Sequence, residues 1–152
     1  MIDKEKFALN GKFTSSAGKP LNKYYDFIPA FFEEDFLCYI EDCFIDLTPC
    51  NLIGIELFGA LLTTYLTGII KESVFNPLFL LKQRKHGARK ELYNQVKPKW
   101  KTYLIDDVIT STKTLLYALD ILERNKIWPD KIICIKNRSA FTKLRGIKII
   151  EI

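Results

Sequence analysis

The sequence KTYLIDDVITSTKTLL, residues 101–116, is an apolar run that ends in two adjacent acids and continues into a hydroxyl-rich segment. Residues 102–105 mix β-branched, aromatic and aliphatic side chains without polar alternation, which is typical of a central parallel strand buried on both faces. We therefore expect Asp106 and Asp107 where this strand emerges from its sheet. In an open α/β sheet, ligands bind at the carboxyl ends of the strands.

Hydroxyl side chains follow the two acids, just before an apolar helical pattern that begins at Leu115. Free backbone N–H groups at a helix start, helped by hydroxyl donors, form a phosphate site. Two carboxylates beside such a site would repel a phosphate unless they face ribose hydroxyls or a bridging Mg²⁺ ion. The pattern suggests a sugar phosphate with a metal ion. The alternative is that one acid caps the helix and the hydroxyls belong to a turn.

The string IDDVITSTKT, residues 105–114, resembles the phosphoribosyl pyrophosphate (PRPP) motif of the phosphoribosyltransferases, in which two acids and a hydrophobic pair precede a Thr/Ser/Gly loop. The resemblance implies that Asp106 and Asp107 are catalytic residues that bind the ribose hydroxyls of PRPP. It also implies a Mg²⁺ cofactor that is held mainly by PRPP and not directly by the protein. The implied 5-phosphate loop consists of Thr110, Ser111, Thr112, Lys113 and Thr114.

Length and composition indicate one globular domain, residues 1–152, without linkers or internal repeats. The longest apolar stretch, residues 57–70, is too short and too interrupted by Gly and Thr to span a membrane. The amino terminus, MIDKEKF, has no apolar signal region, so we expect a cytoplasmic protein without a membrane partner. The net charge of +5 is concentrated in residues 82–101, which would suit a nucleic acid or a small polyphosphate.

Residues 7–27, FALNGKFTSSAGKPLNKYYDF, are turn-rich around short β-like pieces. After the PRPP motif, this segment also resembles the amino-terminal hood of orotate phosphoribosyltransferases, with its Phe-Thr, Ser-Gly and Tyr-Tyr-Asp elements. The resemblance implies a small hood over residues 1–28 and contacts to the base from Tyr24 and Tyr25. The alternative is a hairpin that packs both tyrosines on the core.

Residues 51–59, NLIGIELFG, predict a short buried strand and a turn in which Gly54 and Gly59 permit close backbone approach, followed by a helix over 61–70. The string resembles the pyrophosphate loop of the same family, which implies PRPP contacts from Glu56 and Gly59.

Residues 76–83, NPLFLLKQ, read as a strand, and the basic segment after them must be an exposed loop or short hairpin. The KHG string resembles the mobile loop of the orotate enzymes, which closes over the pyrophosphate, and implies a mobile basic loop over 82–100. Lys82 and Arg84 would then bind PRPP, and Lys85 and His86 would neutralise or protonate the leaving pyrophosphate as catalytic residues. The alternative is a solvated face that only confers solubility.

Strands around Leu52, Phe79, Tyr103, Ile133 and Ile149, with helices between several of them, predict an α/β fold with a mostly parallel central sheet and helices on both faces. Residues 32–44 have the period of an amphipathic helix. In the orotate enzymes, an Asp-Arg pair after the fourth of these strands lies near the base. The resemblance therefore implies that Arg138 binds the carboxylate of the base, with Asn137 in place of the usual acid. The alternative is a solvent-exposed arginine at the end of a strand.

The implied reaction is transfer of ribose 5-phosphate from PRPP to a nitrogen of orotate, with release of pyrophosphate, by a homodimer in which the basic loop reaches the neighbouring site. Three alternatives remain open. The acceptor could be another nucleobase. The chain could be a degenerate, non-catalytic PRPP-binding protein, because family members usually carry Gly where this chain has Thr112 or Lys113. A nucleic-acid-binding module comes last, because it leaves the two acids unexplained, and we expect no nucleic acid partner.

Overall fold

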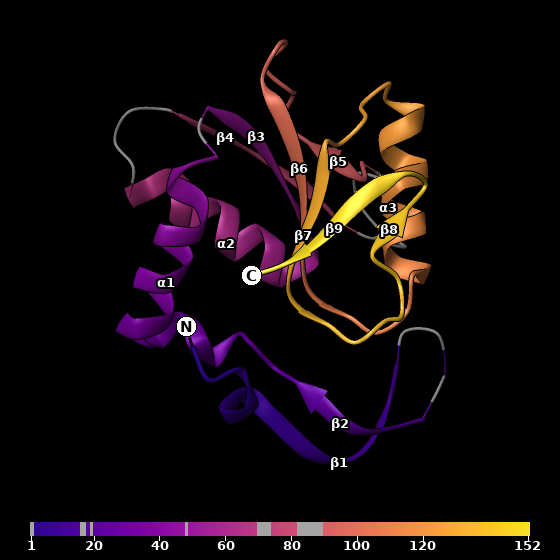
Figure 1. Ribbon diagram of the computed structural model, residues 1–152. Coiled ribbons are helices and arrows are strands. Elements are labelled where there is room, and N and C mark those ends of the chain that lie inside the picture. The colour runs from indigo at the N-terminus through magenta and orange to yellow at the C-terminus, as the bar shows by residue number, and fades with distance from the viewer. Residues whose placement is uncertain (1, 16–17, 19, 48, 70–73, 82–89) are drawn as a thin grey trace.

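The computed structural model describes residues 2–15, 18, 20–47, 49–69, 74–81 and 90–152. Within these residues the chain forms a seven-stranded sheet in the order β5-β4-β3-β6-β7-β9-β8 (Figure 1). The inner strands are parallel, and β5 and β8 pair antiparallel at the two edges. This confirms the predicted mostly parallel sheet. The strands are β3 (Cys50–Ile55), β4 (Phe75–Leu80), β5 (Leu92–Tyr93), β6 (Lys101–Ile109), β7 (Lys131–Asn137), β8 (Lys143–Leu144) and β9 (Ile147–Glu151).

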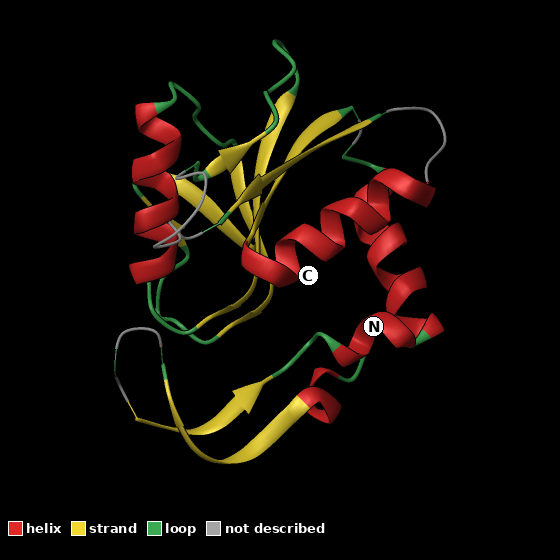
Figure 2. Cartoon of the chain, turned by 180° about the vertical axis from the view of Figure 1, so that it is seen from behind, coloured by secondary structure: helices red, strands yellow, loops and turns green. Residues whose placement is uncertain are grey.

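Helices cover both faces of this sheet, as the sequence predicts (Figure 2). Helices α1 (Glu34–Ile45) and α2 (Glu56–Ile69) pack on one face, and α3 (Lys113–Arg124) packs on the other. Strand β6 shows why: Tyr103 and Ile105 belong to the core beneath α1 and α2, whereas Leu104 between them belongs to the core beneath α3. Successive side chains of a strand point to opposite faces, so an uninterrupted apolar strand fills both cores.

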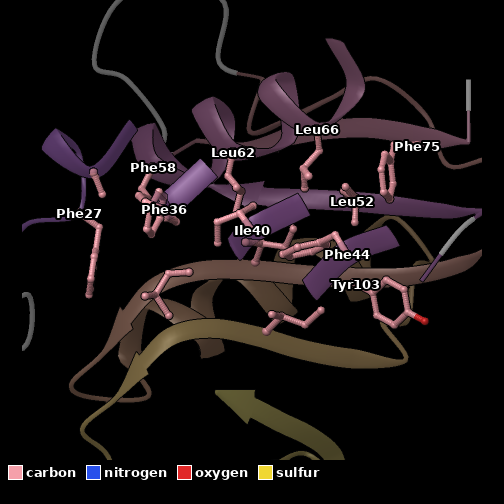
Figure 3. Close-up of a cluster of buried hydrophobic side chains, with 14 of the residues drawn as sticks. Phe27, Phe36, Ile40, Phe44, Leu52, Phe58, Leu62, Leu66, Phe75 and Tyr103 are labelled. Carbon is pink, nitrogen blue, oxygen red and sulfur yellow. The ribbon is translucent and has the colours of Figure 1, made fainter. Parts of the chain in front are cut away.

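The core beneath α1 and α2 is rich in aromatic side chains (Figure 3). Phe36, Ile40 and Phe44 from α1 follow the helical period, and Figure 3 shows them between Leu62 of α2 and the sheet. All four side chains are fully buried. Burying side chains of this size stabilises a fold by about 1.5–3 kcal/mol each. The amphipathic pattern at residues 32–44 is therefore scaffold.

The hood is a separate two-stranded antiparallel sheet that lies across from the main sheet in Figure 1. Phe27, which is fully buried, anchors it: its ring lies 5.4 Å from that of Phe7 and 6.4 Å from that of Phe58 in α2. The hood therefore rests on the amino-terminal end of α2. Its elements are the 3-10 helix η1 (Lys4–Phe7), strands β1 (Ala8–Thr14) and β2 (Pro20–Tyr25), and the 3-10 helix η2 (Pro29–Phe32).

Two element boundaries differ from the sequence-based expectation. Helix α2 begins at Glu56, directly after β3, so Gly59 lies in the helix and not in a turn before it. The physical reason is the predicted close approach of the two glycines, since a Cβ on Gly54 would lie 2.1 Å from the carbonyl oxygen of Gly59. Strand β6 continues to Ile109, because its pairing with β7 extends past both acids.

A buried polar cluster closes the amino-terminal edge of the sheet. The Oδ1 atom of Asn51 accepts hydrogen bonds from the backbone N–H of Lys97 and from Asn76, each at 2.8 Å. Its amide donates to the carbonyls of Lys97 and Trp100 and to Thr102 Oγ1 at 3.2–3.3 Å. These bonds tie the segment 94–100, which was expected to belong to the mobile loop, to strands β3, β4 and β6. Among the helices that the structure describes, none is long and apolar enough to cross a membrane.

Candidate active site

The carboxyl-terminal edge of the sheet faces the hood across a pocket of about 450 Å³. Strand β3 lies between β4 and β6, so the connections after β3 and β6 leave toward opposite faces of the sheet. Ligands of open α/β sheets bind at such a switch point. Residues from the ends of β3, β6 and β7 line the pocket on one side, and β2 lines it on the other. The topology thus places the pocket where a ligand site is expected.

Asp106, which is buried, and Asp107, which is partly buried, form an acidic pair in this pocket. Burial, and then the neighbouring charge of Asp107, hold the pKa of Asp106 well above its ordinary value. Burial also raises the pKa of Asp107, although the backbone N–H of Val108, 2.7 Å from its Oδ1 atom, acts in the opposite direction. The two side chains share a hydrogen bond that favours a proton on Asp106 and a charge on Asp107. The pKa of Asp106 is therefore raised more strongly than that of Asp107.

Glu56 lines the pocket opposite this pair, at the junction of β3 and α2. Its φ of 54° lies in the left-handed region, which a residue other than glycine adopts at a cost of about 1–3 kcal/mol. Its charge also contributes to the raised pKa of Asp106. Gly59 does not line the pocket, and instead contacts the backbone of Gly54, which lets α2 begin at the sheet edge.

The loop after β6 brings Thr110 and Thr114 to the pocket, whereas Ser111, Thr112 and Lys113 do not line it. Helix α3 starts at Lys113 with Thr112 as its N-cap, and the Thr112 side chain makes no capping hydrogen bond. The reading in which an acid caps the helix is therefore wrong. The hydroxyl of Ser111 is buried without a hydrogen-bond partner among the described residues. No residue of this loop has a positive φ, so its path does not require glycine.

The hood and the end of β7 bring the three predicted base-binding residues to the same pocket. Tyr24 is 44% exposed, and its ring lies 5.6 Å from that of Phe13. Tyr25 is buried, with its ring stacked on Phe27. The guanidinium of Arg138 lies 5.5 Å from the Tyr25 ring centroid. Tyr24 and Arg138 therefore offer surface to a ligand, while Tyr25 behaves mainly as the core residue of the alternative reading.

Some lining residues received no role from the sequence. Asp26 and Ser15 of the hood, Leu57 and Phe58 of α2, and Val108 of β6 also line the pocket. The sequence did offer a signal that Asp26 belongs to the site, because it directly follows the two tyrosines. The predicted loop residues Lys82, Arg84, Lys85 and His86 lie outside the described residues.

The acids of the pocket are compatible with the predicted role of Mg²⁺. The described part of the chain contains no cluster of three or more His, Cys, Asp or Glu residues that could hold a metal by itself. Proteins usually bind Mg²⁺ through one or two carboxylates together with phosphates of the substrate. Asp107 and Glu56 provide such carboxylates beside the pocket, so the donor set fits an ion that arrives with a phosphorylated substrate.

Comparisons with known proteins agree with this geometry at the level of the fold. No protein-family model and no curated protein matches the sequence. An orotate phosphoribosyltransferase from Aeropyrum pernix superposes with a TM-score of 0.72 and 19% identity, over 97% of this chain and 88% of that one. An adenine phosphoribosyltransferase from Thermoanaerobacter pseudethanolicus superposes with a TM-score of 0.65 and 16% identity, over 98% of this chain and 96% of that one.

A third structure, UMP synthase from Leishmania donovani, gives a TM-score of 0.73 and 14% identity, over 97% of this chain and 33% of that one. The matched enzymes thus differ in the base named for them. The chain has the type I phosphoribosyltransferase fold, with its switch-point pocket between sheet and hood.

Proposed function

We propose that this protein is a PRPP-dependent phosphoribosyltransferase that transfers ribose 5-phosphate to orotate and releases pyrophosphate. The observation that carries the proposal is the acidic pair Asp106–Asp107, which lies at the switch point directly before the loop that starts α3. A lone acidic pair would be compatible with many ligands. Its combination with a helix start is what suits a phosphorylated sugar.

In the proposed complex, Asp106 and Asp107 hold the ribose hydroxyls. Thr110, Thr114 and the first-turn amides of α3 bind the 5-phosphate. As pyrophosphate leaves, positive charge develops on the sugar ring, and the fixed carboxylate of Asp107 stabilises it. Bound Mg²⁺ would neutralise charge on the phosphate oxygens beside Asp107 and Glu56.

Two further groups complete the proposed reaction. Arg138 binds the carboxylate of orotate, because a guanidinium recognises a carboxylate through paired hydrogen bonds. Lys82 and Arg84 bind the pyrophosphate of PRPP, and Lys85 and His86 neutralise or protonate it as it leaves. An acceptor without a carboxylate would not depend on Arg138. Turnover of orotate, uracil and adenine by wild type and by Arg138→Leu therefore separates the candidate bases.

The acidic pair is tested by Asp107→Asn, which keeps the shape of the side chain but removes its charge. We expect a loss of orotate turnover of about 100-fold or more, since electrostatic stabilisation of this kind is worth several kcal/mol. The measurements are calorimetry with PRPP and Mg²⁺, followed by a spectroscopic orotate assay.

Asp120→Asn is the matched control, because Asp120 lies on the exposed side of α3 and pairs with Arg145. Orotate consumption by Asp107→Asn at the wild-type rate would refute the assigned role. PRPP binding by wild type without release of pyrophosphate with any base would instead favour the non-catalytic PRPP-binding protein.

We further propose that the protein is a homodimer, joined through an apolar groove between α2 and strands β4 and β5. Its lining includes Phe32, which is 89% exposed, and Leu61, Pro77 and Phe79. Charges of opposite sign flank the groove. On one wall, Tyr65 donates to Glu41 of α1 at 2.5 Å, and on the other, Lys90 Nζ lies 5.4 Å from the Tyr93 ring centroid. A twofold axis would bring each acidic wall to a basic one.

Phe32→Asp is expected to convert the dimer into a monomer in sedimentation experiments, because it places a charge in the apolar contact. Phe141→Asp is the control, since Phe141 is also exposed, at 51%, but does not line the groove. A wild-type monomer at high protein concentration, or a Phe32→Asp dimer, would contradict this assignment.

A further inference from the structure

Tyr25 lies at the centre of a cluster of charged side chains that joins the hood to the ends of β7 and β9. Its ring is 4% exposed and stacks on Phe27, with centroids 6.0 Å apart and planes 11° apart. Its hydroxyl donates to Glu5 Oε1 at 2.6 Å. Three cations lie over the ring, at 5.5–5.9 Å from its centroid: Lys23, Lys136 and Arg138. The ring is therefore occupied by the protein itself.

Arg138 is held at three points. Its backbone N–H donates to the carbonyl of Ile109 at 2.8 Å, and its Nη1 atom donates to the carbonyl of Lys23 at 2.7 Å. Its guanidinium also lies over the Tyr25 ring. A guanidinium has five N–H donors in a rigid plane, so fixing the plane also fixes the direction of every donor. Because Arg138 lines the pocket, this orientation decides where an anion can bind there.

Glu5 holds the other side of this arrangement without lining the pocket. It accepts hydrogen bonds from Lys23 Nζ at 2.7 Å and from Tyr25, and Lys136 Nζ lies 4.0 Å from its Oε1 atom. Hydrogen bonds from Lys23 and Tyr25 lower the pKa of Glu5, so it is ionised at neutral pH. Glu5 therefore fixes Lys23, whose carbonyl accepts a hydrogen bond from Arg138. It also fixes the Tyr25 ring, over which the Arg138 guanidinium lies.

We propose that Tyr25 and Glu5 are positioning residues that orient Arg138 toward an anionic group on the acceptor base, and that Tyr25 does not itself contact the base. The inference rests on the proposed function, since it assigns the determinants of acceptor specificity in the same pocket. Orientation of this kind lowers the cost of ordering a flexible side chain when ligand binds. The orientation of Arg138 should affect the binding of the acceptor base and not the binding of PRPP.

The first test is independent of turnover. In nuclear magnetic resonance spectra of the free protein, the side-chain Nε–H signal of Arg138 is assigned by its absence from Arg138→Lys. Ring currents from Tyr25 should displace this signal from the position of a solvated arginine. We expect Tyr25→Leu to return it to that position, Glu5→Gln to move it in the same direction, and Tyr25→Phe to leave it displaced, since the ring is kept.

The second test is kinetic, with orotate as the acceptor. Tyr25→Leu should raise the KM for orotate by about tenfold, as expected for a lost oriented ion pair, with PRPP affinity unchanged. The double variant Tyr25→Leu/Arg138→Lys should be no weaker than Arg138→Lys alone, because Tyr25 acts through Arg138. Glu33→Gln is the control, since Glu33 pairs with Lys6 in the hood and is not one of the residues described above that contact Tyr25 or Arg138.

An unchanged Arg138 signal in Tyr25→Leu would overturn the positioning role, whatever the activity of the protein. So would equal losses of PRPP and orotate affinity, which would indicate a general collapse of the hood. If the wild type turns over no base and the Arg138 signal still responds to Tyr25→Leu, the proposed function fails and the positioning of Arg138 stands.

Discussion

The two ends of the central sheet differ in how fully their buried polar groups are hydrogen-bonded. At the amino-terminal edge, Asn51 is fully buried and both ends of its amide make hydrogen bonds of 2.8–3.3 Å. At the carboxyl-terminal edge, the buried Asp106 and the partly buried Asp107 lie beside each other with raised pKa values. Ser111 Oγ is buried without a partner among the described residues. Satisfied polar groups stabilise a fold, whereas such frustrated groups gather at functional sites.

The same two strands supply both ends. Strand β3 carries Asn51 near its start and leads directly into Glu56, and β6 carries Thr102 near its start and Asp106 toward its end. The difference between the edges is therefore not a difference between strong and weak elements. Each strand is anchored at one end by hydrogen bonds. This anchoring compensates for the backbone strain at Glu56 and for the burial of Asp106 at the other end.

The largest effect should follow from Asn51→Ala. It leaves the buried partners of the amide without hydrogen bonds, and we expect a loss of about 3 kcal/mol or more in the free energy of unfolding, measured by urea denaturation. Asn10→Ala is the control, because Asn10 is exposed on β1. The comparison of the two edges would be broken if Asn51→Ala were as stable as the control.

A smaller effect, with a characteristic pH dependence, should follow from Asp106→Asn. The pKa of Asp106 is raised in the folded protein, so the unfolded chain releases this proton first as the pH rises. The contribution of Asp106 to stability is complete below its unfolded pKa, near 3.8, and is lost as the pH rises through the folded value. The variant lacks this loss. Its stability relative to wild type should therefore increase with pH. Its orotate turnover should be lower than that of wild type.

This prediction is checked by urea denaturation of both proteins at several pH values from 4 upward. A stability difference between Asp106→Asn and wild type that is constant with pH would show that the acid is not strained in the folded state. It would also remove the contrast with Asn51.

The smallest effect is expected from Thr112→Gly, which introduces the residue that phosphoribosyltransferases usually carry at the position of Thr112 or Lys113. Thr112 has a φ of −78°, so glycine relieves no strain there. We expect a loss of stability of at most about 1 kcal/mol, from the greater freedom of the unfolded chain, and unchanged PRPP affinity by calorimetry. Much tighter PRPP binding by the variant would show that the liganded loop adopts a path only glycine allows.

Local patterns predicted most of the fold. The inner strands and all three α-helices follow from apolar runs and helical periods, and the paired acids mark the pocket before any topology is known. The start of α2 at Glu56 did not follow, because it depends on the contact between Gly54 and Gly59 after both have folded. The extent of β6 to Ile109 likewise depends on pairing with β7.

The surroundings of Tyr25 could not be predicted at all. The sequence offered two readings for this residue, a base contact or a core side chain, and the choice depends on partners from distant parts of the chain. Glu5 lies 20 positions away, and Arg138 reaches the carbonyl of a residue 115 positions away. Contacts of this range leave no periodic pattern or local motif. They appear only when the topology brings β2 and the end of β7 together.

The long reach of these contacts has a consequence for biosynthesis. Lys4 pairs with Glu151, 147 positions later, and Arg138 caps a hood that was translated long before it. A nascent chain can therefore dock its hood on α2, but it lacks the second set of hood contacts until β7 and β9 have left the ribosome. The side of the pocket that Arg138 lines is therefore completed only after the residues before it have been synthesised.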